Sequence, residues 1–173
     1  CYQPLDVSYP KERLAFMMAD ADCKLLIADE PLLELVSEYQ GPTLFMGDIA
    51  SLPACERSTY HPSPEDPFVL LYSSVTTGVP KGLVLDHANL CNFCLWARDF
   101  YEMDETCRSA AYASFGFDAC MMDMNSSLTL GATLCIIPDD IRLDLMAIDD
   151  YLDKNHVTHQ FITGAARSDS EEI

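Results

Sequence analysis

The chain has 173 residues and a formal net charge of −18, with apolar residues at 49% and charged residues at 22%. This length is typical of one domain with a buried core, and the apolar fraction excludes an intrinsically disordered polymer. No apolar run reaches the roughly 18 residues that a membrane-spanning helix needs, and the negative charge disfavours binding to nucleic acid or anionic lipid.

The first part of the chain alternates helical and strand-like patterns. Apolar residues that recur at three and four positions predict a helix over 11–21. The run 24–28 predicts a buried strand, 31–39 returns to helical spacing, and 43–46 predicts a second strand. Four prolines predict an irregular surface connection over about 51–67. This alternation favours the α/β class, with a mixed, mostly parallel sheet flanked by helices.

The second part continues the alternation, and no internal repeat interrupts it. A buried strand is predicted at 68–72, and the polar segment 73–81 follows it. Further apolar or strand segments are predicted at 83–85, 110–113, 132–137 and 158–162, and helices at 87–103, 118–130 and 143–155.

The segment Tyr72-Ser-Ser-Val-Thr-Thr-Gly-Val-Pro-Lys-Gly82 carries the most chemistry. It concentrates four hydroxyls, a glycine and a lysine between two predicted strands. Hydroxyl and backbone N–H groups donate to phosphate oxygens, and an ammonium offsets their charge, so the segment suits a polyphosphate. An ordinary polar hairpin loop fits the composition equally well. A Walker A loop is excluded, because Lys81 is followed by Gly82 and not by Ser or Thr.

This segment resembles the phosphate-loop signature of the adenylate-forming superfamily, Tyr-Thr-Ser-Gly-Thr-Thr-Gly-x-Pro-Lys-Gly. Asp86-His-Ala-Asn-Leu90 resembles the continuation of that signature. Tyr2-Gln-Pro-Leu-Asp-Val-Ser-Tyr-Pro-Lys-Glu-Arg13 is similar to an early motif of the amino-acid adenylation domains of nonribosomal peptide synthetases. Ala113-Ser-Phe-Gly-Phe-Asp-Ala119 is similar to their Phe-Asp-x-Ser motif. The resemblance implies that residues 1–173 form a partial N-terminal subdomain, an internal fragment of such an AMP-binding domain.

The resemblance also implies an activity. Domains of this family activate an amino acid with ATP and Mg²⁺ to an aminoacyl adenylate, and they pass the acyl group to the phosphopantetheine thiol of a peptidyl carrier protein. It implies catalytic roles for Thr76 and Lys81, while the family's Mg²⁺ ligand lies beyond the motifs present in this chain. The residues implied to bind phosphate are Ser73, Ser74, Thr76, Thr77, Gly78 and Lys81.

The amino-acid site is implied in the same way. Asp118 matches the family's acidic residue that receives the α-ammonium group of the substrate, and Ala119, Met122 and Phe161 match positions that line the side-chain pocket. From the residues alone, a carboxylate at the start of a helix is also a plain capping residue. Apolar residues at helical spacing are, by the same reasoning, usually core residues.

Two hypotheses about the activity stay open at this point. Val75 stands where the family has a glycine, and a β-branched residue in a left-handed backbone conformation would be strained. The family's nucleoside-binding motifs and its second lysine are also absent from the sequence. The chain is therefore expected to be either a fragment of an active ligase or a non-catalytic remnant that no longer binds ATP.

The eight cysteines suggest a third hypothesis and a location. Cys91-Asn-Phe-Cys94 could form a thiol or metal-binding module, although a zinc site needs four ligands and the sequence has no second such pair. Nothing resembles a signal peptide, so a reduced, cytoplasmic protein is expected. Five cysteines lie in apolar segments that are predicted to be helix or strand, namely Cys23, Cys91, Cys94, Cys120 and Cys135.

Overall fold

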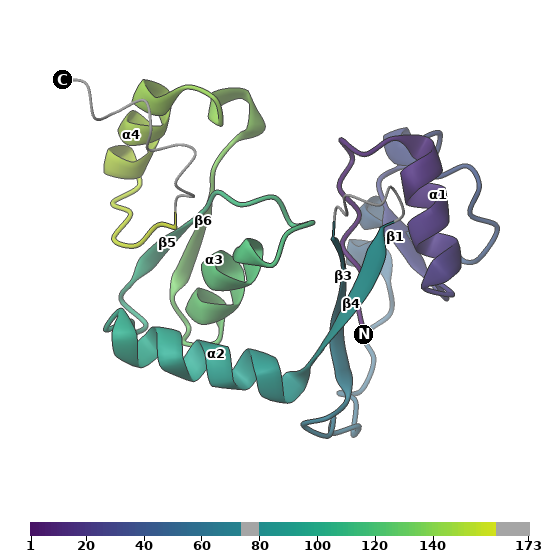
Figure 1. The fold of residues 1–173 in the computed structure, drawn as a ribbon, viewed down its shortest axis with the longest axis horizontal. Helices are drawn as coiled ribbons and strands as arrows, with labels where there is room; N and C mark the ends of the chain where they lie inside the picture. The colour runs from purple at the N-terminus through teal and green to yellow at the C-terminus, as the bar shows by residue number, and fades with distance from the viewer. Residues whose placement is uncertain (74–79, 162–173) are drawn as a thin grey trace.

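The computed structural model describes residues 1–73 and 80–161. Within these ranges the strands form three two-stranded sheets, of which two are parallel and one is antiparallel. Helices pack beside each of them (Figure 1). The predicted mixed, mostly parallel α/β class is confirmed, but the strands are divided among three small sheets instead of forming one.

The N-terminal unit is a helix packed on a parallel strand pair. Helix α1 (Lys11–Asp20) precedes β1 (Leu26–Ala28), which pairs with β2 (Thr43–Phe45). Leu14 and Met18 of α1 are buried against β1, because their spacing of four places both on one face of the helix. The three elements agree with the helix and the two strands predicted for this part.

The predicted helix over 31–39 is wrong. The structure has a short 3₁₀ helix, η1 (Glu30–Leu32), followed by turns. The backbone bonds continue in steps of three residues, from Leu35 N to Leu32 O at 2.9 Å and from Tyr39 N to Val36 O at 3.0 Å. Apolar residues three apart fit three residues per turn as well as 3.6, so the spacing could not distinguish the two helices.

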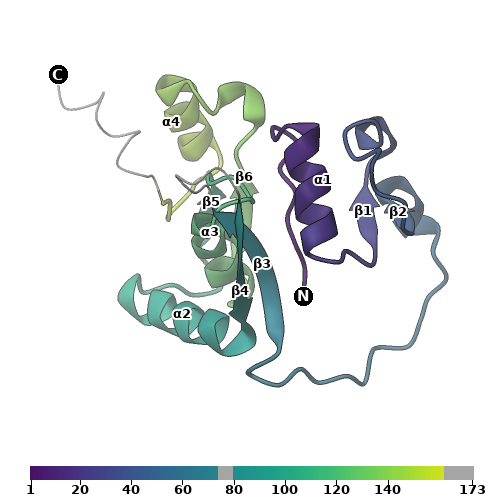
Figure 2. The same cartoon turned by 45° about the vertical axis from the view of Figure 1, so that its right-hand side comes forward.

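A long connection leads from the N-terminal unit to a hairpin. After a 3₁₀ helix, η2 (Met46–Ser51), residues 53–63 form neither helix nor strand, and all of them are described. These residues form a wide arc along the outside of the molecule (Figure 2). Strands β3 (Pro67–Ser73) and β4 (Lys81–Asp86) then pair in antiparallel fashion.

Helix α2 (His87–Phe100) follows the hairpin directly. The Asp86 carboxylate accepts a 2.7 Å hydrogen bond from the Asn89 amide, which starts the helix with an N-cap. The helix ends three residues earlier than predicted because Glu102 adopts a left-handed conformation with φ of 52°. The Met103 amide then bonds back to the Arg98 carbonyl at 2.9 Å, which closes the end of the helix.

The C-terminal unit places a parallel pair between two helices. Strands β5 (Arg108–Ala111) and β6 (Thr133–Ile136) are joined by α3 (Ala119–Leu128), and α4 (Leu145–Lys154) covers β5 through Ile148. A 3₁₀ helix, η3 (Asp139–Ile141), precedes α4. The predicted strand at 158–162 is present, within the described residues, only as an isolated bridge between Ser109 and His159.

Helix α3 connects the two halves of the molecule. It lies between the β5–β6 pair and the β3–β4 hairpin (Figure 1). Its Cys120 and Met121 are buried against Val69 and Leu71 of β3, in one of the core clusters. None of the helices in the two described ranges is long and apolar enough to cross a bilayer.

Candidate functional site

The ends of the predicted phosphate loop meet at the mouth of the β3–β4 hairpin. Ser73 ends β3 and Lys81 begins β4, and the two are direct partners in the strand register. The Ser73 hydroxyl donates to the Lys81 carbonyl oxygen at 3.5 Å, and Lys81 is exposed. The remaining residues implied for the loop, Ser74, Thr76, Thr77 and Gly78, lie outside the described residues, as does Val75.

The last glycine of the same signature has a packing role. Gly82 pairs with Tyr72 across the hairpin, and a Cβ atom added to it would meet Leu70 at 3.0 Å and the Tyr72 ring at 3.4 Å. The Leu70 and Tyr72 side chains occupy the space that a side chain at position 82 would need. The glycine therefore allows the Tyr72 ring to lie close against the neighbouring strand.

A cavity of about 390 Å³ lies beside the hairpin, between β3, β4, α2 and α3. Its walls are mostly apolar and include Phe68, Leu85 and Phe93. A cavity of this size with few polar groups is typical of a small-molecule site. The four residues that the sequence assigned to the amino-acid site, Asp118, Ala119, Met122 and Phe161, all line this one cavity.

Asp118 has the position of an N-cap without its usual hydrogen bond. Its backbone is already helical, with φ of −59° and ψ of −29°, and its side chain accepts no capping bond from the described amides. The carboxylates of Asp86 and Asp144, by contrast, cap α2 and α4. The structure therefore does not support the plain capping role for Asp118, and the carboxylate can bind a partner in the cavity.

A second carboxylate lies five residues further along α3. Asp123 is 4% exposed, and its Oδ2 atom accepts hydrogen bonds from the amides of Tyr112 at 3.0 Å and Ala113 at 3.1 Å. Burial raises the pKa of this carboxyl group, and the two amide hydrogen bonds offset the effect only in part. Asp123 lines a neighbouring cavity of about 290 Å³, which shares Met122 and Phe161 with the first.

Sequence reasoning missed Asp123, although a signal was present. Asp123 follows the buried Cys120 by three residues and precedes the buried Ser127 by four, so it lies on the inner face of α3. Charged residues within a helix usually lie on the solvent-exposed face, so the burial of Asp123 was not expected.

The early motif and the Asp118 motif are in contact. The Ser114 hydroxyl donates to Oδ2 of Asp6, while Oδ1 of Asp6 accepts from the Ser8 amide at 2.9 Å and the Ser8 hydroxyl at 2.7 Å. Burial raises the pKa of Asp6, but the hydrogen bonds from Ser114 and Ser8 outweigh it, so the pKa is lowered. No sequence pattern connects Asp6 with Ser114, which lies 108 positions further along the chain.

The thiols do not form the proposed module. All eight cysteines are free, with Cys91 exposed and Cys94 buried. Among the residues that the structure describes, no three Cys, His, Asp or Glu side chains gather as a metal site requires. Of the five cysteines expected in helices or strands, Cys23 instead lies between α1 and β1. A thiol or metal-binding function is therefore not favoured.

Comparison with known proteins gives one family throughout. The family model described as AMP-binding enzyme matches residues 1–166. Surfactin synthase subunit 1 of Bacillus subtilis (strain 168) is 36% identical over 168 residues, which cover 93% of this chain and 5% of the synthase. The chain thus spans about one twentieth of the length of this curated relative.

Solved structures show the same fold. The nonribosomal peptide synthetase FmoA3 superposes with a TM-score of 0.82 at 23% identity, over 91% of this chain and 17% of the synthetase. A form of FmoA3 with alpha-methyl-L-serine-AMP bound gives a TM-score of 0.78 at 23% identity, over 91% of this chain and 18% of the synthetase. The predicted partial subdomain fold is confirmed by these likenesses.

Proposed function

The chain belongs to the family of AMP-binding enzymes, and from that membership we propose that it supplies the phosphate loop and part of the amino-acid pocket of a nonribosomal peptide synthetase. The proposed reaction joins an amino acid to AMP. An oxygen of the substrate carboxylate forms a bond to the α-phosphorus of ATP, and the bond from that phosphorus to the leaving pyrophosphate breaks. The products are an aminoacyl adenylate and pyrophosphate.

The observation that carries this proposal is the position of Asp118. Its carboxylate lines a mostly apolar cavity and is not engaged in capping α3. Asp118 is exposed, so its carboxylate is accessible to a cationic partner that enters beside the apolar wall of the cavity. The α-ammonium group of an amino acid is a partner of the right charge and size, and Met122 and Phe161 then line the space for its side chain.

ATP fits the other end of the hairpin. Lys81 is exposed and is the strand partner of Ser73 where the two strands meet the loop. In our proposal the ammonium offsets the negative charge of the phosphates and the hydroxyl donates to a phosphate oxygen. The described residues contain no cluster of three metal-ligating groups, so none of them is assigned to Mg²⁺ and no step is derived through it.

The later step belongs to the same proposal. We expect the acyl group to pass from AMP to the phosphopantetheine thiol of a peptidyl carrier protein, as in the synthetases that the chain resembles. The comparisons do not favour the non-catalytic remnant, for which Val75 and the absent downstream motifs were the two arguments, and Val75 lies outside the described residues. The cytoplasmic location expected from the free thiols stays a prediction.

The experiment uses the complete gene product and measures amino-acid-dependent exchange of pyrophosphate into ATP. Asp118→Asn should raise the KM for the amino acid by roughly 10- to 150-fold, because losing a charge-assisted hydrogen bond costs about 1.5–3 kcal/mol. The KM for ATP should change little. Asp149→Asn is the matched control, since Asp149 is an exposed residue of α4. An unchanged amino-acid KM in Asp118→Asn would contradict the proposal.

A further inference from the structure

The backbone segment that delivers Asp118 to the cavity runs from the end of β5 to the start of α3. Its first residues are held by Asp123, whose carboxylate accepts the Tyr112 and Ala113 amides at 3.0 and 3.1 Å. This carboxylate belongs to the second turn of α3, so the helix holds the beginning of the segment that precedes it. Both ends of residues 112–118 are thereby tied to one rigid element.

The middle of the segment is held from the opposite side by the early motif. The Ser114 hydroxyl donates to Asp6 and also accepts the Gly116 amide at 3.2 Å. The Phe117 amide bonds to the Ser114 carbonyl at 3.0 Å, which completes the turn before Asp118. Ser114 thus connects Asp6 to the last residues before the helix.

A second contact from the early motif acts on the same turn. The space beside Gly116 is filled by Tyr9, because a Cβ atom at position 116 would lie 2.5 Å from the Tyr9 hydroxyl. The Arg13 guanidinium in turn stacks 4.0 Å above the Tyr9 ring. The turn before Asp118 therefore packs against Tyr9 of the loop before α1, and Arg13 of α1 packs on the Tyr9 ring.

These contacts hold the backbone from which the Asp118 side chain extends to the cavity. The segment before Asp118 is fixed by hydrogen bonds at Tyr112, Ala113, Ser114 and Gly116, whereas the Asp118 side chain has no capping bond of its own. We propose that Asp6 is a positioning residue that acts through Ser114 to aim the Asp118 carboxylate into the cavity. This inference rests on the proposed function of Asp118.

The role follows from the requirements of an anchoring carboxylate. A group that receives an ammonium must hold its direction before the substrate arrives, because a carboxylate that must first be ordered binds more weakly. A charged acceptor such as Asp6 gives Ser114 a stronger hydrogen bond than a neutral acceptor would. Losing the Asp6 carboxylate should loosen the turn before Asp118 and weaken amino-acid binding, while ATP binding is unaffected.

The test compares two aspartates with the same local geometry. Asp104 accepts the amide and the hydroxyl of Thr106 at 2.9 and 2.6 Å, as Asp6 does with Ser8, but Asp104 has no contact with the turn before Asp118. In the complete gene product, Asp6→Asn and Ser114→Ala should each raise the KM for the amino acid about fivefold to tenfold. The KM for ATP should stay unchanged in both, and Asp104→Asn should change neither constant.

Two further measurements separate positioning from general stability. Ser114→Thr retains a hydroxyl and should restore most of the amino-acid affinity that Ser114→Ala loses. Deuterium exchange at the Gly116 amide should be faster in Asp6→Asn than in the wild type and unchanged in Asp104→Asn. The double variant of Asp6→Asn and Ser114→Ala should lose no more amino-acid affinity than Ser114→Ala alone, because Ser114→Ala already removes the hydrogen bond to Asp6.

The outcomes distinguish this inference from the proposed function. If the wild type catalyses exchange and Asp6→Asn leaves the amino-acid KM unchanged, the positioning role is wrong and the proposed function stands. Equal losses in the amino-acid and ATP constants would also overturn it, since they would indicate a general structural role. If the wild type shows no amino-acid-dependent exchange, both the function and the positioning role are overturned.

Discussion

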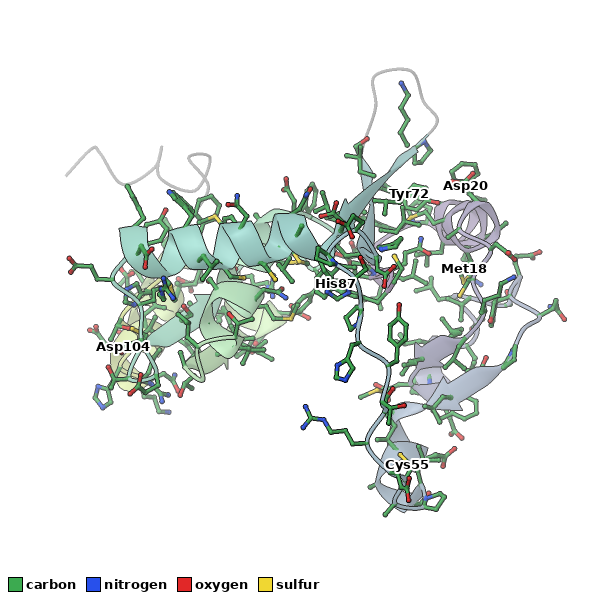
Figure 3. All side chains as sticks on the ribbon, turned by 90° about the horizontal axis from the view of Figure 1, so that it is seen from below. Met18, Asp20, Cys55, Tyr72, His87 and Asp104 are labelled. Atoms are coloured by element: carbon green, nitrogen blue, oxygen red, sulfur yellow. The ribbon has the colours of Figure 1, made fainter. Side chains whose placement is uncertain are left out.

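The Tyr72 hydroxyl donates a 2.7 Å hydrogen bond to the Asp20 carboxylate, across 52 residues of sequence. It joins the last residue of α1 to the strand that leads into the predicted phosphate loop, and the two side chains meet where the helix passes the hairpin (Figure 3). Burial, followed by the interaction with Asp20, raises the pKa of Tyr72. The first residue of the loop signature therefore also links two units of the fold.

Removing this hydroxyl should destabilise the folded chain. Tyr72→Phe keeps the edge contact of the ring with Phe16, whose centroid is 6.3 Å away, and removes the hydrogen bond. Because Asp20 is exposed, we expect a loss of about 1 kcal/mol in the free energy of unfolding, measured by urea denaturation of residues 1–173. A double-mutant cycle with Asp20→Asn should show coupling, and strictly additive losses would exclude a direct link.

Lys81 should matter for ATP and not for the amino acid. Lys81→Ala removes a charge-assisted contact of about 1.5–3 kcal/mol, so exchange at limiting ATP should fall roughly 10- to 150-fold in the complete gene product. Lys154→Ala, at the exposed end of α4, is the matched control and should have no effect. Wild-type exchange kinetics in Lys81→Ala would remove this residue from the phosphate site.

The stabilisation that Asp6 supplies should depend on pH. Its pKa is lower in the folded chain than in the unfolded chain, where it is about 3.9, so its contribution is present above that value and is lost as the pH falls through the folded-state pKa. The difference in free energy of unfolding between wild type and Asp6→Asn should be largest near pH 6–7 and should shrink below about pH 4. If the difference in free energy of unfolding grows as the pH falls, the pKa of Asp6 is not lowered in the folded chain.

The thiols should react according to burial and not as a pair. Burial raises the pKa of Cys94, and burial together with Asp123 and Asp118 raises the pKa of Cys120 to about 11. Iodoacetamide at pH 8 should therefore label the exposed Cys91 well before Cys94 and Cys120. Mass spectrometry of digested protein measures the order, and equal rates at Cys91 and Cys94 would revive the thiol-module hypothesis.

Much of the fold could be predicted because the apolar periodicity was strong. Helices α1, α2, α3 and α4 were predicted with boundaries within a few residues, since each buries one face. The error over 31–39 arose where a period of three and a period of 3.6 give the same short pattern. The division into three small sheets could not be predicted, because strand pairing depends on contacts that are distant in sequence.

The site was predictable where a motif carried it and not elsewhere. Asp118 and Met122 could be named from the sequence, and the structure brings both to one cavity, although their binding roles stay a prediction. Asp6 and Asp123 could not be named, because their importance comes from hydrogen bonds to Ser114 and to two amides beyond β5. Such contacts appear only after the chain has folded.

The most direct test of the account is exchange of labelled pyrophosphate into ATP by the complete gene product, with each amino acid in turn. At least one amino acid should stimulate the exchange, and its analogue without the α-amino group should not, because the Asp118 carboxylate would then lose its cationic partner. Exchange that no amino acid stimulates, or that the analogue stimulates equally well, would contradict the proposed site.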